Sequence, residues 1–245
     1  MTDPVLVTET ADRFFVLLNR PEARNAIDLD MVEALHDVCH RLETEPKVAM
    51  IRGTGGTFAA GADIAQLSKR RRDDALRGIN SGIFDRIRRL PMPVIGLIDG
   101  YALGGGAELA YACDFRIGTP TTKIGNPEPG LGILAAAGAG WRLKELVGEP
   151  LAKEILLAGR ILDADEALAC HLLNEVAEDV ETAGHRLADR IVAQAPLAIR
   201  LTKSLFHAPP DAHPLIDDIA QAVLFETEDK HERMKAFLDR KKVKS

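Results

Sequence analysis

The sequence has few cysteines and no long apolar run. Its three cysteines, Cys39, Cys113 and Cys170, lie far apart and form no Cys-x-x-Cys pair, so neither a disulfide framework nor a cysteine-based metal site is expected. The longest stretch without a charged residue, 129–141, has 13 residues and four glycines, whereas a membrane-spanning helix needs about 20 apolar residues. The first six residues do not resemble a secretory signal. We therefore expect a soluble, cytoplasmic protein with no membrane partner.

An excess of positive charge is also absent. The formal net charge is -6 and the sequence pI is about 5.7, which disfavours nucleic-acid binding because that depends on a basic surface. Lys69-Arg70-Arg71-Arg72 could form a local basic patch, but Asp73 and Asp74 follow at once, which favours a solvated helix face. With 245 residues and 46% apolar side chains, the chain can form one large domain with a small appendage.

Several common catalytic motifs are missing. The sequence has no Gly-x-Ser-x-Gly elbow, no His-Glu-x-x-His zinc motif and no Gly-Lys-Ser or Gly-Lys-Thr phosphate loop. Residues 130–135 loosely fit a dinucleotide fingerprint, but they follow a proline-containing loop and not a strand. Hydrolytic, metal-dependent and nucleotide-binding functions therefore lack their usual sequence support.

The apolar pattern predicts an α/β protein followed by a helical region. Extended stretches at 5–8 and 13–18 predict a hairpin, and the spacing of apolar residues in 28–42 predicts a helix. A strand at 48–52 and a helix at 68–90 follow, and the order then repeats with a strand at 94–98, a helix at 107–113 and a strand at 115–117. Later helices are predicted at 149–158, 163–173, 182–194, 197–206 and 214–241.

Two turns rich in small residues, 53–62 and 100–106, join a strand to a helix. Glycine and alanine let backbone N–H groups come close to a ligand oxygen. Two such donors could stabilise negative charge on a carbonyl oxygen, as in an oxyanion hole. The glycines could equally serve only to make tight turns, and the turns alone leave both interpretations open.

Two acids stand among apolar neighbours next to these features. Glu108 follows Gly104-Gly105-Gly106, and Glu128 follows Asn126-Pro127. A carboxylate in apolar surroundings is costly unless it has a partner or a chemical role. For Glu108 the alternative is an acid that balances the dipole at a helix N-terminus.

Together these segments resemble the motifs of the crotonase (enoyl-CoA hydratase/isomerase) superfamily, and most closely those of enoyl-CoA hydratases. The motifs read Phe-Ala-Ala-Gly-Ala-Asp-Ile at 58–64, Pro-Val-Ile-Gly-Leu-Ile-Asp-Gly-Tyr-Ala-Leu-Gly-Gly-Gly-Ala-Glu-Leu at 93–109, Cys-Asp at 113–114 and Gly-Asn-Pro-Glu at 125–128. Further matches at 19–21, 25–26, 142–143, 158–160 and 237 extend the resemblance over nearly the whole chain.

The resemblance implies a fold, an assembly and a substrate. It implies a crotonase-like spiral of repeated strand-strand-helix units in residues 1–195, and a C-terminal helical region in 196–245 that mediates trimer formation. The expected assembly is a homotrimer or a dimer of trimers. The implied substrate is an acyl-CoA thioester, so CoA enters with the substrate, and no separate cofactor and no metal is expected.

The resemblance also implies roles for individual residues. Glu108 and Glu128 match the two glutamates that hold a water, and the backbone N–H groups of Ala62 and Gly105 match the oxyanion hole. Leu131 and Trp141 are the candidates for the acyl pocket. The expected contacts to CoA and substrate are Arg24, Ala26, Ala60, Ala62, Asp63, Ile64, Gly104, Gly105, Phe237 and Arg240.

Possession of both acids favours hydration of a 2-enoyl-CoA over isomerisation, since hydration needs a base for water and an acid for C2. The segment 135–143 reads Ala-Ala-Ala-Gly-Ala-Gly-Trp-Arg-Leu, where related hydratases usually read Pro-Gly-x-Gly-Gly-Thr-Gln-Arg-Leu. Isomerisation, thioester hydrolysis and carbon–carbon bond chemistry therefore stay open. A non-enzymatic RNA-binding role is weakened because Arg41 is the only fixed positive charge in 29–42.

Overall fold

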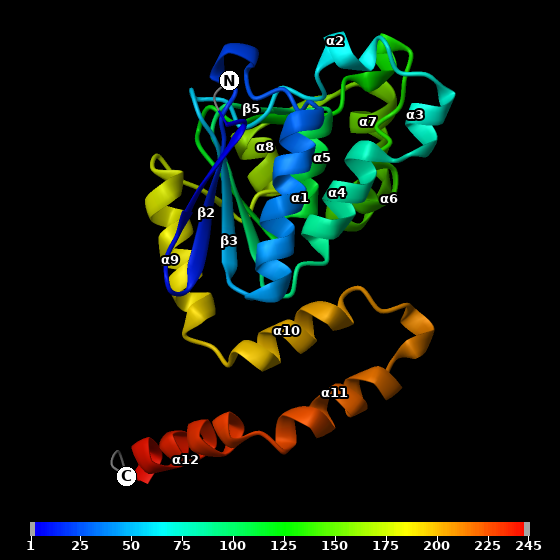
Figure 1. Cartoon of the computed structure of the whole chain (residues 1–245). Helices are drawn as coiled ribbons and strands as arrows, with labels where there is room; N and C mark the ends of the chain where they lie inside the picture. Colours follow the sequence, from blue (N-terminus) through cyan, green and yellow to red (C-terminus); the bar gives the residue numbers. More distant parts are fainter. Residues whose placement is uncertain (1–2, 243–245) are drawn as a thin grey trace. The chain divides into compact units, whose positions relative to one another are not determined.

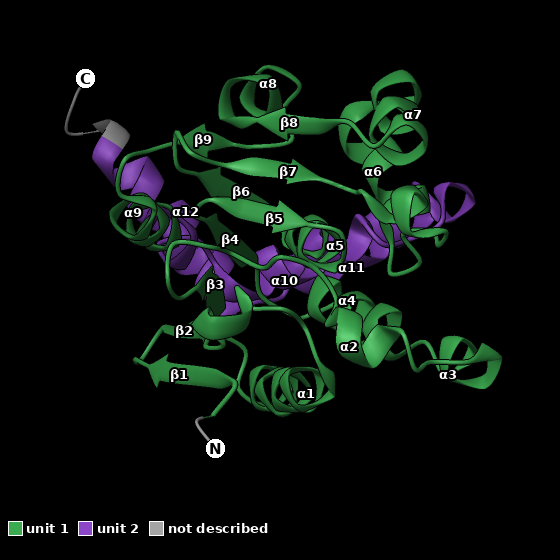
Figure 2. Cartoon of the chain, turned by 90° about the horizontal axis from the view of Figure 1, so that it is seen from above, with its two compact units in different colours: residues 1–189 green, residues 190–245 purple. Residues whose placement is uncertain are grey.

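A computed structural model describes residues 3–242. By their internal contacts, the residues form two compact units, 1–189 and 190–245 (Figure 2). The division falls inside helix α9 (Val180–Val192), whereas the sequence predicts a boundary after residue 195. The first unit contains all of the strands and helices α1 to α8 (Figure 1).

The larger sheet has six strands in the order β1-β2-β3-β4-β6-β9. They are Val5–Glu9, Arg13–Leu18, Val48–Gly53, Val94–Ile98, Phe115–Gly118 and Glu175–Val176. The first two strands pair antiparallel, which confirms the predicted hairpin, and the other pairs are parallel. All five residues of β4 are buried, as expected for a parallel strand covered on both faces.

A smaller sheet of three short strands carries the site. It contains β5 (Tyr101–Leu103), β7 (Lys123–Gly125) and β8 (Ile161–Asp163), with β5 parallel to β7 and β7 antiparallel to β8. A parallel bridge from Ala59 to Ala102 joins the turn after β3 to β5. The sequence analysis missed these strands because three residues are too few to show a period of two.

Three helices of the first unit lie side by side (Figure 1). Helix α4 (Ile79–Arg88) packs against α1 (Leu29–Thr44) and α5 (Gly105–Ala112). The Asp28 carboxylate accepts a hydrogen bond from the Met31 N–H at 2.9 Å and caps α1. Every residue of α5 is buried, so this helix is held on all sides.

The predicted helix at 68–90 is wrong. In this segment a turn after α2 (Ile64–Leu67) is followed by two separate helices, α3 (Arg72–Leu76) and α4. Gly78 separates α3 from α4 with φ of 62°, a left-handed conformation that interrupts a helix. The basic run 69–72 therefore lies mostly in the turn between α2 and α3, and not along one helix face.

The later helices also differ in detail from the prediction. The predicted helix at 163–173 ends early, as α8 (Ala164–Ala169), and His171 is left-handed with φ of 61°. The predicted helix at 214–241 is two helices, α11 (Leu215–Phe225) and α12 (Glu228–Lys242). Thr227 lies between them, and its Oγ1 accepts the N–H of Lys230 in the first turn of α12. The remaining helices are α6 (Ala139–Val147), α7 (Glu149–Ala158) and α10 (Pro196–Leu205), with short 3-10 turns at Pro21–Ala23, Glu128–Leu131 and Pro210–Ala212. Within residues 3–242, no helix is both long and apolar enough to cross a membrane.

Candidate active site

A cavity of about 160 Å³ lies where the two small-residue turns meet the loop after β7. It brings together eight of the residues predicted from the sequence: Ala60, Ala62, Ile64, Gly104, Gly105, Glu108, Glu128 and Leu131. The cavity is also lined by residues that the prediction did not include: Gly61, Leu67, Arg70, Asn80, Pro127, Ile133, Leu134, Ala136 and Ala137.

Two backbone N–H groups are available at one end of this cavity. Gly105 is the first residue of α5, so its N–H has no acceptor within the helix. The segment around Ala62 is fixed by two bonds to Ile27, whose N–H donates to Gly61 and whose carbonyl accepts from Asp63. A Cβ atom on Gly105 would lie 3.3 Å from the Ala62 nitrogen, so the two residues are close. Neither N–H donates a hydrogen bond to another residue in 3–242.

Glycine is required around these donors. A Cβ on Gly106 would lie 2.1 Å from the Ala59 carbonyl oxygen, which no side chain can tolerate. Gly104 has φ of 53°, and a Cβ there would lie 3.1 Å from Glu128 Oε1. The Gly104 N–H is itself bonded to the Gly125 carbonyl at 2.9 Å. These glycines therefore do more than form a tight turn, because they let α5 begin directly beside the cavity.

Glu108 lies in the first turn of α5 and is 5% exposed. Its Oε1 accepts the N–H groups of Ala137 and Ala139, at 2.7 and 3.1 Å. Burial raises the pKa of Glu108 to about 7; the two N–H bonds lower it, and the charge of Glu128 raises it. A carboxyl with this pKa can exchange a proton near neutral pH, which a helix-capping acid does not need to do.

Glu128 begins the 3-10 turn after β7 and is 8% exposed. Its Oε1 accepts a hydrogen bond from Asn126 Nδ2 at 3.4 Å, while its buried Oε2 has no hydrogen-bond partner among the described residues. Burial raises the pKa of Glu128, and the bonds from its own backbone and from Asn126 act in the opposite direction. Because an unpaired buried oxygen is costly, Oε2 is available for a ligand or water in the cavity.

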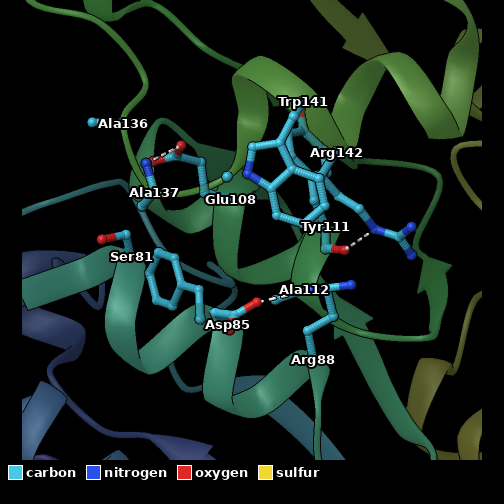
Figure 3. A pocket seen from close by; sticks show the side chains of 12 residues that line it. Ser81, Asp85, Arg88, Glu108, Tyr111, Ala112, Ala136, Ala137, Trp141 and Arg142 are labelled. Carbon is cyan, nitrogen blue, oxygen red and sulfur yellow. Dashed lines mark hydrogen bonds and ion pairs between the residues drawn. The ribbon is translucent and has the colours of Figure 1, made fainter. Parts of the chain in front are cut away.

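Trp141 lies in a different cavity from Leu131. This second cavity, of about 150 Å³, is enclosed by α4, α5 and α6 (Figure 3). Only Glu108, Ala136 and Ala137 line both cavities. The Arg88 guanidinium lies 4.8 Å from the centre of the Trp141 ring, and Arg88 is bonded to Asp85 at 2.9 Å. The two predicted acyl-pocket residues thus line different cavities, and Glu108 lines both.

The remaining predicted contacts support the cavity through the backbone. The Arg24 carbonyl accepts the Ala60 N–H at 3.0 Å, and Arg24 is left-handed with φ of 52°. The Ala26 carbonyl accepts from the Arg20 guanidinium at 2.5 Å. Neither Arg24 nor Ala26 lines the cavity.

Asp63 has a structural role in the described part of the chain. Its carboxylate caps α2 by accepting the Gln66 N–H at 3.1 Å, and it pairs with Arg20 at 3.2 Å. The Gln66 bond, followed by the Arg20 pairing, lowers the pKa of Asp63 against the effect of burial. Phe237 and Arg240 lie on α12 in the second unit, and their part in binding stays a prediction.

The sequence analysis missed the N–H donors to Glu108. These donors come from the backbone of 137–139, where residue type carries no signal except a run of small residues. Asn80 was not predicted either, because it belongs to no motif; its Oδ1 is buried beside the cavity and has no hydrogen-bond partner within residues 3–242.

The arrangement is suited to acid–base chemistry on a carbonyl compound. Two N–H donors can bind a developing oxyanion, and two buried carboxyls can transfer protons. Within residues 3–242, no group of three or more His, Cys, Asp or Glu side chains could hold a metal ion.

Comparison with known proteins places this arrangement in a family. Residues 14–244 match the enoyl-CoA hydratase/isomerase family. A short-chain-enoyl-CoA hydratase of Clostridium acetobutylicum is 34% identical, over 93% of this chain and 92% of that protein, and a crotonyl-CoA hydratase of Syntrophomonas wolfei is 35% identical, over 97% and 96%. The crystal structure of an enoyl-CoA hydratase from Bacillus anthracis matches with a TM-score of 0.91 and 29% identity, over 97% of this chain and 96% of that one.

These matches cover both the two turns and the two acids of the cavity. The chain belongs to the enoyl-CoA hydratase/isomerase family and has the α/β crotonase fold.

Proposed function

We propose that this enzyme is an enoyl-CoA hydratase, which reversibly adds water to a 2-enoyl-CoA and forms a 3-hydroxyacyl-CoA. The observation that carries the proposal is the pair of buried carboxyls, Glu108 and Glu128, lining one cavity with two available N–H donors. Isomerisation needs only one proton-transfer group, whereas hydration uses two. The relatives named as hydratases support the same choice.

In the proposed mechanism, the thioester carbonyl oxygen accepts hydrogen bonds from the N–H groups of Ala62 and Gly105. These bonds draw electron density from the double bond and make C3 electrophilic. Water adds its oxygen to C3 while one carboxylate takes its proton, and the other carboxyl delivers a proton to C2. The new C–O bond uses an electron pair of the water oxygen, and the new C–H bond uses the electron pair of the double bond. The step therefore needs no oxidant or reductant.

The carboxyl pair must hold one proton for this step. Burial raises the pKa of both groups, and the charge of Glu128 raises that of Glu108 further, so ionising one disfavours ionising the other. The step therefore needs one protonated and one ionised carboxyl, and the raised pKa of Glu108, about 7, makes its protonated form accessible near neutral pH. After hydration the proton has moved from one carboxyl to the other, and exchange with solvent restores the starting state.

The remaining part of the substrate lies along the turn before α2. Ala60, Ile64 and Arg70 line the cavity on this side, so the backbone of 60–64 can contact the pantetheine arm and Arg70 can attract the phosphates of CoA. The fatty or related acyl group extends toward Leu131 or past Glu108 toward Trp141.

A panel of thioesters tests the proposal directly. Purified protein is incubated with straight, branched and cyclic 2-enoyl-CoAs, and products are identified by mass spectrometry. Hydration adds the mass of one water with CoA retained. Free CoA without the hydroxyacyl product would indicate thioester hydrolysis. An unchanged mass with a moved double bond would indicate isomerisation. Either result alone would overturn the proposal.

We also propose that the protein is a homotrimer or a dimer of trimers. Residues 190–245 expose several large apolar side chains, including Phe206, Leu215, Ile219, Phe237 and Leu238, at 56 to 83% of their surface. Exposed apolar surface of this kind is usually covered in an assembly. Light scattering at micromolar concentration should give the mass of three or six chains, and a stable monomer would contradict the assignment.

A further inference from the structure

A buried hydrogen-bonded chain leads from α5 to Glu128. Tyr111 is 1% exposed and lies one turn after Glu108 on α5. Its hydroxyl donates to Asn126 Oδ1 at 3.0 Å. Asn126 is fully buried, and its Nδ2 lies 3.4 Å from the Gly104 carbonyl oxygen and 3.4 Å from Glu128 Oε1.

The donor and acceptor atoms of this hydrogen-bonded chain can be assigned. The Tyr111 hydroxyl has one proton to donate, and burial keeps it protonated by raising the pKa of the phenol above its usual range. The Gly104 carbonyl can only accept a hydrogen bond, so the amide end that faces it must be Nδ2, and Oδ1 is then the end that accepts from the Tyr111 hydroxyl. The opposite amide orientation would place Oδ1 against Glu128 Oε1, and two acceptors would face each other without water.

We propose that Tyr111 and Asn126 are positioning residues for Glu128: the hydroxyl anchors the amide oxygen, and the amide binds Oε1 and leaves Oε2 for the reacting water. This inference rests on the proposed hydration. Asn126 also binds the carbonyl of Gly104, whose peptide link supplies the Gly105 N–H. One amide thus couples the orientation of a proton-transfer group to that of an oxyanion donor.

The polar atoms themselves support more than a packing role. A phenylalanine would fill the space of the Tyr111 ring, so the hydroxyl is not required for volume. Glu128 Oε1 has the Asn126 amide as its partner, whereas Oε2 has none among the described residues, so the amide distinguishes the two carboxyl oxygens. The charged residues that line the same cavity as Glu128 are Glu108 from α5 and Arg70, and the charge of Glu128 acts on Glu108.

The first variant is Tyr111→Phe, and its matched control is Tyr101→Phe. Tyr101 is the other of the two tyrosines in the sequence, lies on β5 and is 48% exposed. Tyr111→Phe leaves Asn126 Oδ1 without its donor, so the amide is held less firmly, its bond to Glu128 weakens and the pKa of Glu128 rises. We expect kcat to fall roughly tenfold with KM changed less than about twofold, and the limb of the pH–rate profile governed by Glu128 to move to higher pH. Tyr101→Phe should behave as wild type.

The second variant is Asn126→Leu, which removes the amide and keeps the volume. Its loss of kcat should equal or exceed that of Tyr111→Phe, and the double variant should be no worse than Asn126→Leu alone, because Tyr111 acts through Asn126. Losses that add fully in the double variant would overturn the inference, since they would mean two independent structural effects.

A measurement that does not depend on catalytic turnover tests this inference independently of the proposed function. Carboxyl-carbon NMR titration of glutamate-labelled protein, assigned with Glu128→Gln, gives the pKa of Glu128 in each variant whatever reaction the enzyme catalyses. A higher pKa in Tyr111→Phe and Asn126→Leu, with no change in Tyr101→Phe, supports the positioning role even if the thioester panel shows a different reaction. An unchanged pKa of Glu128 in both variants would overturn it.

Discussion

The two carboxyls of the site are held in different ways. Glu108 is on a buried helix, and backbone N–H groups of Ala137 and Ala139 bind it. Glu128 is in a short 3-10 turn, and the side chain of Asn126 binds one of its oxygens and leaves the other unpaired. Substitution can therefore remove the partner of Glu128 directly, but it can change the partners of Glu108 only through the backbone.

The difference has a consequence for proton transfer. Both pKa values are raised by burial, to about 7 for Glu108. Fixed N–H donors hold Glu108 in one orientation, whereas the unpaired oxygen of Glu128 can bond to whatever enters the cavity. The following changes test this contrast.

The largest effect is expected when either carboxyl loses its ability to exchange a proton. Glu108→Gln and Glu128→Gln should each lower kcat at least ~10²-fold while binding of CoA thioesters stays nearly intact, because an amide keeps the shape but not the acid–base function. Steady-state kinetics and binding calorimetry measure the two parts. Glu33→Gln, on the exposed side of α1, is the control, and near-wild-type turnover in either site variant would refute the two-carboxyl mechanism.

Glu108 should also make stability depend on pH. Its pKa is about 7 in the folded protein and near the ordinary glutamate value of 4.5 in an unfolded chain, so ionisation opposes folding. The folded state is most favoured below about pH 4.5, and this contribution is lost as the pH rises through 7, by roughly 3 kcal/mol. Glu108→Gln should not lose this contribution. Its free energy of unfolding in urea should therefore rise relative to that of wild type from about pH 5 to about pH 8. Glu33→Gln should follow wild type, and parallel curves for all three proteins would contradict the raised pKa.

The backbone donors of Glu108 can be disturbed at one glycine. Gly138 lies between the two donors with φ of 131°, and its Cβ position is empty, so Gly138→Ala adds backbone strain of about 1 to 3 kcal/mol without a clash. We expect displaced N–H groups, a higher pKa of Glu108 and a loss of kcat of about tenfold. Gly140→Ala is the control, since Gly140 lies in α6 with an equally open Cβ position and no positive φ. Equal activity of both variants would show that the two N–H bonds do not tune Glu108.

The smallest effect is expected from a substitution in the second cavity, which Trp141 lines. If the acyl chain enters the cavity lined by Trp141, then Trp141→Gln should change the ranking of kcat/KM for crotonyl-CoA against longer, branched and cyclic enoyl-CoAs about tenfold, because each methylene is worth ~1 to 3 kcal/mol. Trp141→Phe, which keeps a ring under Arg88, should change it less. An unchanged ranking in Trp141→Gln would mean that Trp141 is structural and that Leu131 borders the acyl group.

Local sequence patterns determined much of the first unit. The helix at 29–44 was predictable because its apolar residues repeat every three or four positions and Asp28 stands where a cap is needed. The break at Gly78 was not predicted, because the apolar spacing continues across it while the backbone does not. The break at Thr227 falls in the polar stretch 226–233, where apolar spacing gives no signal for the end of a helix. The strands at 101–103, 123–125 and 161–163 were too short to show a pattern and depend on pairing with distant segments.

The sequence by itself determined which residues have acid–base and oxyanion chemistry available. Glu108 and Glu128 stand beside glycine-rich turns, and the motif resemblance implies their common site. Only the tertiary structure decided that Leu131 and Trp141 border different cavities, that residues 137–139 donate to Glu108, and that Tyr111 reaches Glu128 through Asn126. The physical reason is that hydrogen-bond direction and cavity shape depend on segments distant in the chain, whose contacts are set by packing and leave no local pattern.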